Sequence, residues 1–234
     1  MFLVNRVVDI FLEIVQRIPP IVLHNMEKAK MLKLVFWHLA VDGMGGDYVE
    51  FGVAQGGSLK AAILANKFSK SKLIGVNSVS RNFWGFDTFQ KFLSENQSDK
   101  AHPTWHGGKF NSNYEIVARR FKKFKFVKLI AVDVSQLRQM YPTPSLSLGI
   151  SEQAAVIFFD MDLYSPTLSA LRWVSPIIGQ GTFLIFDESF AFSGDVRKGE
   201  AAALTQFMVS RSDINLRYFG SYGAGGVVYI VDLK

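Results

Sequence analysis

Two apolar segments of the sequence each end in a pair of acidic residues, and these acids are the side chains best suited to chemistry. The segments span residues 156–159 and 182–186. The acids that follow them are Asp160, Asp162, Asp187 and Glu188. Short apolar runs rich in Val, Ile and Phe predict buried strands of a parallel sheet, and open α/β sheets bind ligands beyond the carboxyl ends of such strands. We therefore expect the four carboxylates to meet at one functional edge.

Carboxylates held this close repel one another, so they need either a shared proton or a bound cation. A hard divalent ion such as Mg²⁺ is the natural candidate for a site of oxygen ligands. Such an ion would hold a substrate hydroxyl and lower its pKa, while a neighbouring carboxylate accepts the proton. Asp162 stands two positions after Asp160, turned to another side of the chain or into the loop, which makes it the candidate base.

A glycine-rich segment, residues 50–58, follows the first predicted strand and opens the first predicted helix after it. Glycine lets a ligand approach the backbone closely, and the helix N-terminus offers free N–H groups and partial positive charge. The spacing is G-x-x-x-G-G rather than the G-x-G-x-x-G of dinucleotide binders, so a pyrophosphate cradle is less well supported. A tight structural turn is the alternative explanation.

Three further residues carry possible site roles. Asp87 closes the second predicted strand, where nucleotide-binding sheets place an acid on ribose hydroxyls, but it could equally cap the segment that starts at Thr88. Asp133, after the third strand, could contact an adenine edge or cap the turn that follows. His106 lies in a long polar segment, residues 88–113, of the kind that often forms a binding loop, and it is the one histidine we consider as a catalytic candidate.

Composition places the chain among globular proteins. Its 234 residues fit one domain, with 49% hydrophobic and 20% charged residues, and 21 Phe predict a bulky core. The absence of Cys excludes disulfides, thiolate metal sites and a Cys nucleophile, and it favours a cytoplasmic compartment.

Two segments invite other partners. Residues 1–23 are apolar, but charges interrupt them, so we expect an amphipathic helix ending at Pro19-Pro20 rather than a signal peptide or a membrane span. That helix would pack on the body or on a second subunit, or attach to a membrane surface. The net charge is +6, and basic residues alternate with Phe in residues 119–128, which could contact nucleic acid; a solvated helix end running into a strand is the favoured interpretation.

The expected elements alternate along the chain. Strands are predicted at 47–53, 81–87, 126–132, 155–159 and 182–186, with helices at 58–68, 114–123 and 166–177. Two more strands, 214–220 and 227–232, flank a glycine-rich turn and form an antiparallel pair. Together they predict an α/β fold: a Rossmann-like, doubly wound sheet of seven strands, mostly parallel with an antiparallel last strand, plus an N-terminal helix. We expect a single domain, with residues 1–44 as a helical extension and 45–234 as the core.

With these motifs in view, the chain resembles the class I S-adenosylmethionine-dependent methyltransferases, and among them the macrocin O-methyltransferase (TylF-like) family of cation-dependent sugar O-methyltransferases. The resemblance covers roughly residues 45–232. The matching motifs lie at 49–58, 85–89, 160–167 and 181–188.

The resemblance implies methyl transfer from S-adenosylmethionine to a hydroxyl, with a sugar as the first acceptor to consider and a catechol-like phenol as the second. It implies cofactor contacts at the methionine end from Glu50, Gly52, Gly56 and Ser58, a ribose contact from Asp87, and Mg²⁺ ligands Asp160, Asp187 and Glu188. It implies Asp162 as the base. The chain departs from the family pattern in three places. The family usually has Asp-Asp where this chain has Asp187-Glu188, and it has Arg where this chain has Gln55. It also has no residues that correspond to 69–80.

Other functions share parts of this pattern. An NAD(P)-dependent oxidoreductase would use the same sheet but has no use for four clustered acids, and a non-catalytic RNA-binding protein could use the basic segment. We expect a small-molecule hydroxyl substrate rather than nucleic acid, no membrane span, and a homo-oligomer.

Overall fold

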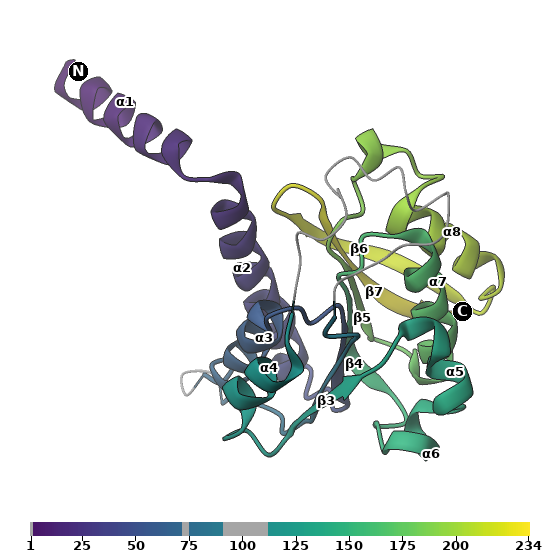
Figure 1. Cartoon of the computed structure of the whole chain (residues 1–234). Helices are drawn as coiled ribbons and strands as arrows, with labels where there is room; N and C mark the ends of the chain where they lie inside the picture. The colour runs from purple at the N-terminus through teal and green to yellow at the C-terminus, as the bar shows by residue number, and fades with distance from the viewer. Residues whose placement is uncertain (1, 72–74, 91–111) are drawn as a thin grey trace.

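The computed structural model describes residues 2–71, 75–90 and 112–234, and within them a single seven-stranded sheet forms the centre of the molecule (Figure 1). The strand order is β3-β2-β1-β4-β5-β7-β6. The strands are β1 (Asp47–Phe51), β2 (Phe83–Asp87), β3 (Val127–Ala131), β4 (Ala154–Phe159), β5 (Phe183–Phe186), β6 (Ile214–Tyr222) and β7 (Gly226–Leu233). The five neighbouring strands β3, β2, β1, β4 and β5 pair in parallel, whereas β7 is antiparallel to both of its neighbours, β5 and β6. The predicted fold class is confirmed.

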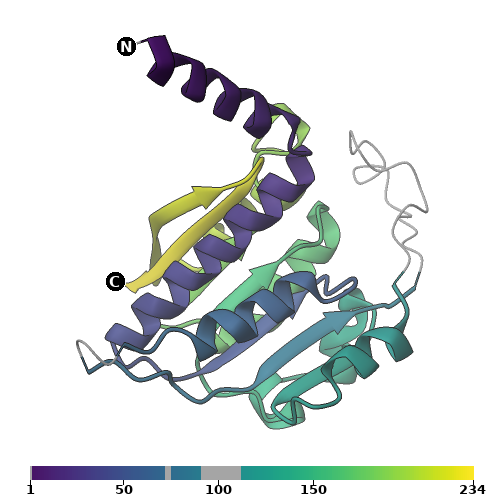
Figure 2. The same ribbon diagram turned by 90° about the vertical axis from the view of Figure 1, so that its left-hand side faces the viewer.

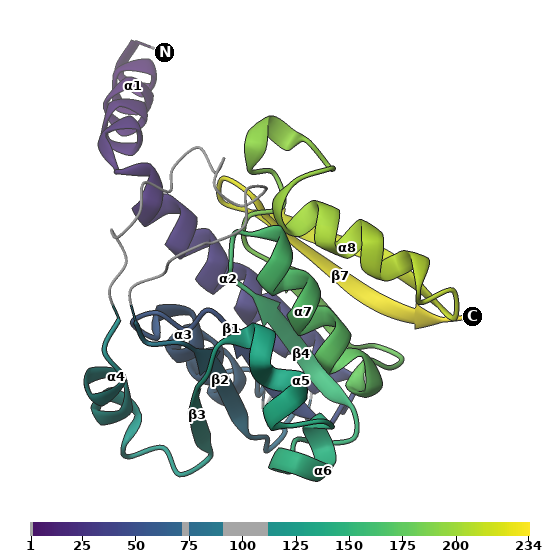
Figure 3. The same ribbon diagram turned by 45° about the vertical axis from the view of Figure 1, so that its right-hand side comes forward.

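Helices cover both faces of the sheet. They are α1 (Phe2–Arg17), α2 (Pro20–Val41), α3 (Gly57–Lys67), α4 (Tyr114–Phe121), α5 (Leu137–Met140), α6 (Pro144–Leu148), α7 (Tyr164–Val174) and α8 (Gly199–Val209), with short 3₁₀ turns at 134–136, 175–177 and 192–194. Helices α2, α3 and α4 lie over one face and α5, α7 and α8 over the other (Figures 1 and 3). Since a strand alternates its side chains, each strand supplies both cores.

The central strands read as continuous apolar runs because they are covered on both faces. In β4, for example, Ile157 and Phe159 pack into the core beneath α7, while Val156 and Phe158 pack beneath α2 and α3. All six residues of β4 are buried. This is why the sequence pattern located the strands so well.

Two parts of the fold differ from expectation. The predicted N-terminal helix is confirmed as α1, which ends at Arg17 just before Pro19-Pro20, but a second, 22-residue helix α2 starts at Pro20 and its inward face joins the core. Proline is well suited to a first helical position because its missing N–H has no partner there anyway. Helix α8, between β5 and β6, was not predicted.

Helix α1 extends away from the body of the molecule (Figures 1 and 2). Large apolar side chains on it, Ile10, Phe11, Leu12 and Ile14, are exposed. Among the described residues, no helix combines the length and the apolar character needed to cross a membrane.

Candidate active site

The acidic residues lie at one edge of the sheet, as predicted, because β4 and β5 are parallel neighbours. Asp160 and Asp187 follow these strands directly, and the Asp187 N–H donates to the Phe159 carbonyl at 3.0 Å. Gly52 follows β1 beside them, with φ +86°. A Cβ atom at Gly52 would stand 1.8 Å from the Asp160 carbonyl oxygen, so glycine is required here for the close approach of two backbones.

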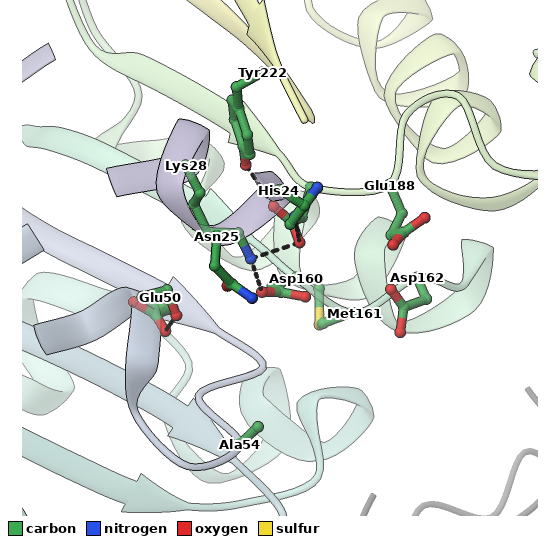
Figure 4. Close-up of polar contacts among 12 residues, drawn as sticks. His24, Asn25, Lys28, Glu50, Ala54, Asp160, Met161, Asp162, Glu188 and Tyr222 are labelled. Atoms are coloured by element: carbon green, nitrogen blue, oxygen red, sulfur yellow. Dashed lines mark hydrogen bonds and ion pairs between the residues drawn. The ribbon is translucent and has the colours of Figure 1, made fainter. Parts of the chain in front are cut away.

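A lysine from the N-terminal part of the chain, Lys28, contacts both Asp160 and Asp187. Figure 4 labels Lys28 and Asp160. The Lys28 ammonium on α2 donates to Asp187 Oδ2 at 2.7 Å and to Asp160 Oδ2 at 3.1 Å. One turn earlier, His24 Nε2 lies 3.2 Å from Asp187 Oδ2, and the Tyr222 hydroxyl donates to Asp187 Oδ1 at 2.6 Å. Asp187 therefore accepts from three side chains, two of them on α2.

These contacts set opposite pKa shifts in the two aspartates. Burial and the neighbouring charge of Asp187 raise the pKa of Asp160 to about 7, and Lys28 offsets part of the rise. Burial would also raise the pKa of Asp187, but the contacts from His24 and Lys28 outweigh it and lower the pKa below its ordinary value. For Lys28, burial acts to lower the pKa, yet the two carboxylates raise it more. Asp187 and Lys28 are thus an ion pair.

The arrangement does not fit the predicted Mg²⁺ site. The ammonium of Lys28 takes up the position between Asp160 and Asp187 that a bridging metal ion would need. In the described parts of the chain, no group of three or more His, Cys, Asp or Glu side chains is disposed to hold a metal ion. The repulsion that the sequence predicted between Asp160 and Asp187 is therefore relieved by the ammonium of Lys28, a cation of the protein itself.

The other two acids, Asp162 and Glu188, lie apart from Lys28 (Figure 4), and a third carboxylate fixes the backbone that carries them. Glu200, on α8, is fully buried and accepts from the backbone N–H groups of Met161, Asp162 and Glu188 at 3.2, 3.3 and 2.9 Å. Asp162 adopts φ +62°, a conformation that Asp tolerates better than most residues. Burial, together with the charges of Asp160 and Glu200, raises the pKa of Asp162 well above its ordinary range.

Glu50, on β1, is fully buried beneath the glycine-rich turn. One carboxyl oxygen accepts from the Ser58 hydroxyl at 2.6 Å and the other from the Tyr48 hydroxyl at 2.5 Å. Burial raises the pKa of Glu50 to about 8, although both hydroxyl contacts act to lower it. The contact between Glu50 and Ser58 connects β1 to the first turn of α3.

The glycine-rich turn presents the N-terminus of α3. Gly56 is its N-cap residue with φ +76°, and no side chain caps the helix there. A Cβ atom added to Gly57 would meet nothing within 4 Å, so the first turn is open. The open N–H groups suit an anion such as a carboxylate.

Asp87 connects the turn to the end of β2. It accepts from the backbone N–H groups of Ala54 and Phe89, both at 2.7 Å, and each of its oxygens retains a lone pair for another donor. Asp133 caps the turn that follows it, because it accepts from the backbone N–H and the hydroxyl of Ser135. This cap is one of the two roles predicted for Asp133. His106 lies outside the described residues.

Sequence reasoning missed Lys28, His24, Tyr222 and Glu200. A signal for the first two was present: in α2 the buried residues Met31, Val35 and Leu39 mark the inward face, and Lys28 and His24 continue that face toward the N-terminus at helical spacing. A lysine on an apolar helix face is a candidate for a buried ion pair. Glu200 offered a weaker signal, as the single acid in an alanine-rich helix.

The chain is similar to a known protein family. The family model described as macrocin-O-methyltransferase (TylF) matches residues 19–210. No curated protein sequence matches the chain significantly.

Solved structures also resemble the chain. The O-methyltransferase NovP is similar with a TM-score of 0.64 and 18% identity, covering 87% of this chain and 79% of that one. The calicheamicin methyltransferase CalS11 is similar with a TM-score of 0.66 and 20% identity, covering 93% and 84%. An O-methyltransferase from Bacillus cereus in complex with SAH has a TM-score of 0.51 and 14% identity, covering 88% and 81%.

Proposed function

Because this chain belongs to the macrocin-O-methyltransferase (TylF) family and is a methyltransferase, we propose that it transfers the methyl group of S-adenosylmethionine to a hydroxyl of a small molecule. The match of the family model over residues 19–210 carries this proposal. The matched range includes the glycine-rich turn, the helix α2 that supplies Lys28, and the acid edge, by which we mean Asp160, Asp162, Asp187 and Glu188.

The cofactor would bind at the carboxyl ends of β1 and β2. The open first turn of α3 suits the carboxylate of its methionine part, and the free lone pairs of Asp87 suit ribose hydroxyls. Glu50 would support this site from below, since Tyr48 and Ser58 occupy its oxygens and keep the turn in place. Gly52 and Gly56 would set the path of the backbone, and we keep Asp133 as a candidate near the adenine. When bound, S-adenosylmethionine supplies an electrophilic methyl group on a sulfonium.

We assign the base to Asp162. The acceptor hydroxyl must lose its proton as the methyl group transfers, and a positioned carboxylate of raised pKa can take it. Glu200 holds the backbone N–H of Asp162, which fixes where the carboxylate stands. His106 remains a second candidate from the sequence.

A sugar hydroxyl is the first acceptor to test. CalS11 is described in its apo structure as a TDP-rhamnose 3′-O-methyltransferase, and it shares the fold. The acid edge, with hydrogen-bonding carboxylates near Asp162, has the chemistry to hold several hydroxyl groups.

Divalent-cation dependence, predicted from the sequence, is not part of the proposed mechanism. Lys28 bridges Asp160 and Asp187, so the predicted ligands Asp160, Asp187 and Glu188 do not surround a free space for a metal ion. No step of the proposed reaction passes through a metal ion.

Helix α1 is the proposed contact between subunits. Its exposed apolar side chains, such as Phe11 at 62% and Ile14 at 57%, would be buried in a homo-oligomer. Replacing both by Glu is expected to reduce the mass measured by light scattering on a sizing column to that of one chain; an unchanged mass would refute the role of α1. We keep the cytoplasm as the proposed compartment, on the cysteine-free composition.

Calorimetry with S-adenosylhomocysteine tests the cofactor. We expect saturable one-site binding, weakened roughly 10- to 100-fold in Asp87→Asn, because a lost hydrogen bond to a charged group costs about 1.5–3 kcal/mol. Asp162→Asn is expected to retain this affinity and to lose most methyl transfer to a sugar acceptor, as general bases contribute roughly 10²–10⁴-fold. No binding by the unaltered protein would refute the proposal.

A further inference from the structure

Helix α2 delivers a positive charge to the acid edge from a distant part of the sequence. Its buried face runs from Leu39 through Val35 and Met31 to Lys28 and His24, so the helix is held by apolar packing at one end and by polar contacts at the other. The Lys28 ammonium lies 5.6 Å from the centre of the Phe158 ring, and its side chain is only 9% exposed. The lysine is therefore fixed in place rather than sampling solvent.

The contacts of Lys28 are those of a bridging cation. The same nitrogen is within hydrogen-bond distance of one oxygen from each aspartate, Asp187 at 2.7 Å and Asp160 at 3.1 Å. A Mg²⁺ ion needs oxygens at about 2.0–2.1 Å in a near-octahedral set. It would have to stand in the space of the ammonium, and the charged lysine would have to leave a buried position.

The remaining contacts of Asp187 support the same arrangement. The Tyr222 hydroxyl donates to its other oxygen at 2.6 Å, and His24 Nε2 lies 3.2 Å from the oxygen that Lys28 contacts. His24 Nδ1 accepts from the Ala224 N–H at 3.2 Å, so the ring can donate from Nε2 in its neutral form. These donors already satisfy Asp187 without a metal ion.

We propose that Lys28 is the resident cation of this acid edge: its ammonium replaces a divalent metal ion between Asp160 and Asp187, and the enzyme binds no metal there. The inference rests on the proposed function for its catalytic meaning, because it makes methyl transfer by this chain independent of divalent cations. The carboxylates that a metal would otherwise neutralise are neutralised by the helix that packs over them.

Titration with Mn²⁺, followed by the electron paramagnetic resonance of the free ion, tests the proposal directly. The unaltered protein and Lys28→Arg, which keeps the positive charge, are expected to show no saturable binding at millimolar Mn²⁺. Lys28→Met removes the charge at similar length, and it is expected to gain one site, at least tenfold tighter than any residual binding to the unaltered protein. Adding Asp160→Asn to Lys28→Met is expected to remove that site.

Two results would overturn the proposal. One is a single saturable Mn²⁺ site in the unaltered protein that Asp160→Asn removes, a measurement that stands even if Lys28→Met does not fold. The other is a folded Lys28→Met variant that binds no more Mn²⁺ than the unaltered protein.

Calorimetry with S-adenosylhomocysteine separates this inference from the proposed function. An affinity that agrees within about twofold between excess EDTA and millimolar Mg²⁺ supports metal independence. Affinity that EDTA abolishes overturns it. If S-adenosylhomocysteine binds neither in EDTA nor in Mg²⁺, the proposed function is overturned. The Mn²⁺ titration alone then decides the role of Lys28.

Discussion

Replacing Lys28 with Met should destabilise the folded protein strongly at neutral pH. The substitution keeps most of the apolar stem but leaves Asp160 and Asp187 without their shared cation. Breaking a buried ion pair by removing one partner typically costs about 3–5 kcal/mol, because the remaining charge is buried and uncompensated. The side chains of Lys28 and Asp187 are 9% and 6% exposed, so we place the cost of that pair within this range; Asp160, at 25%, adds less because water screens it.

A second substitution makes the reasoning specific to charge. Asp160→Asn removes one of the two negative charges, so it should cost little or destabilise slightly when Lys28 is present, yet stabilise the Lys28→Met variant. The expected coupling between the two positions is about 0.5–3 kcal/mol, the range seen for residues in one charged network. Loss of packing alone would give additive effects with no change of sign.

Urea unfolding followed by tryptophan fluorescence measures these free energies, since the chain has 4 Trp. Lys30→Met is the matched control, because Lys30 is an exposed lysine on the same helix and its loss should change stability by less than about 0.5 kcal/mol. If Lys28→Met costs no more than Lys30→Met, or if Asp160→Asn destabilises both backgrounds equally, the buried cation is not what stabilises this edge.

Three further substitutions test other parts of the site. Burial raises the pKa of Glu50 from 4.5 to about 8, so the folded state holds this proton more tightly than the unfolded chain. The contribution of Glu50 to stability should be largest below pH 4.5 and fall by up to about 5 kcal/mol as the pH rises to 8. Glu50→Gln should therefore flatten this part of the pH profile of urea unfolding, and a profile parallel to that of the unaltered protein would contradict the assignment. Glu200→Gln removes one acceptor from three backbone N–H groups and should cost about 1–3 kcal/mol of unfolding free energy, with the exposed Glu13→Gln as its neutral control. Gly52→Ala should cost more than about 2 kcal/mol in thermal or urea unfolding because of its φ of +86° and the Asp160 carbonyl, while Gly57→Ala, in open space, should be neutral or stabilising; equal effects at the two glycines would refute the close-approach argument.

The sequence was most informative where local pattern decides the structure. The buried strands are apolar on both faces, so their runs end sharply at Asp160 and Asp187, and parallel pairing then brings those two residues together. The same logic predicted the antiparallel β6–β7 pair from its glycine-rich turn. In each case, neighbours in sequence or in adjacent strands determine the outcome.

The partners of the acids could not be predicted in this way. Lys28 lies 132 positions from Asp160 and 159 from Asp187, and no local pattern states where an N-terminal helix will pack. Helical spacing places Lys28 on the inward face of α2, but it does not say which carboxylates that face will cover. Glu200 was hidden for a related reason, since small apolar residues around it gave no clear helical stripe and α8 was not predicted.

The four acids of the edge divide into two pairs with different electrostatics, and this division bears on which of them can accept a proton. Asp160 and Asp187 share the Lys28 cation, and Asp187, held by three donors, has a lowered pKa that makes it a poor proton acceptor near neutral pH. Neither Asp162 nor Glu188 forms an ion pair within the described residues, and burial raises the pKa of both, although the charges of His24 and Lys28 offset part of the rise at Glu188. The negative charge retained by Asp187 is one cause of each rise. Lys28 therefore helps to keep Asp187 charged, and the negative charge of Asp187 favours proton uptake at Asp162, which is where we place the base.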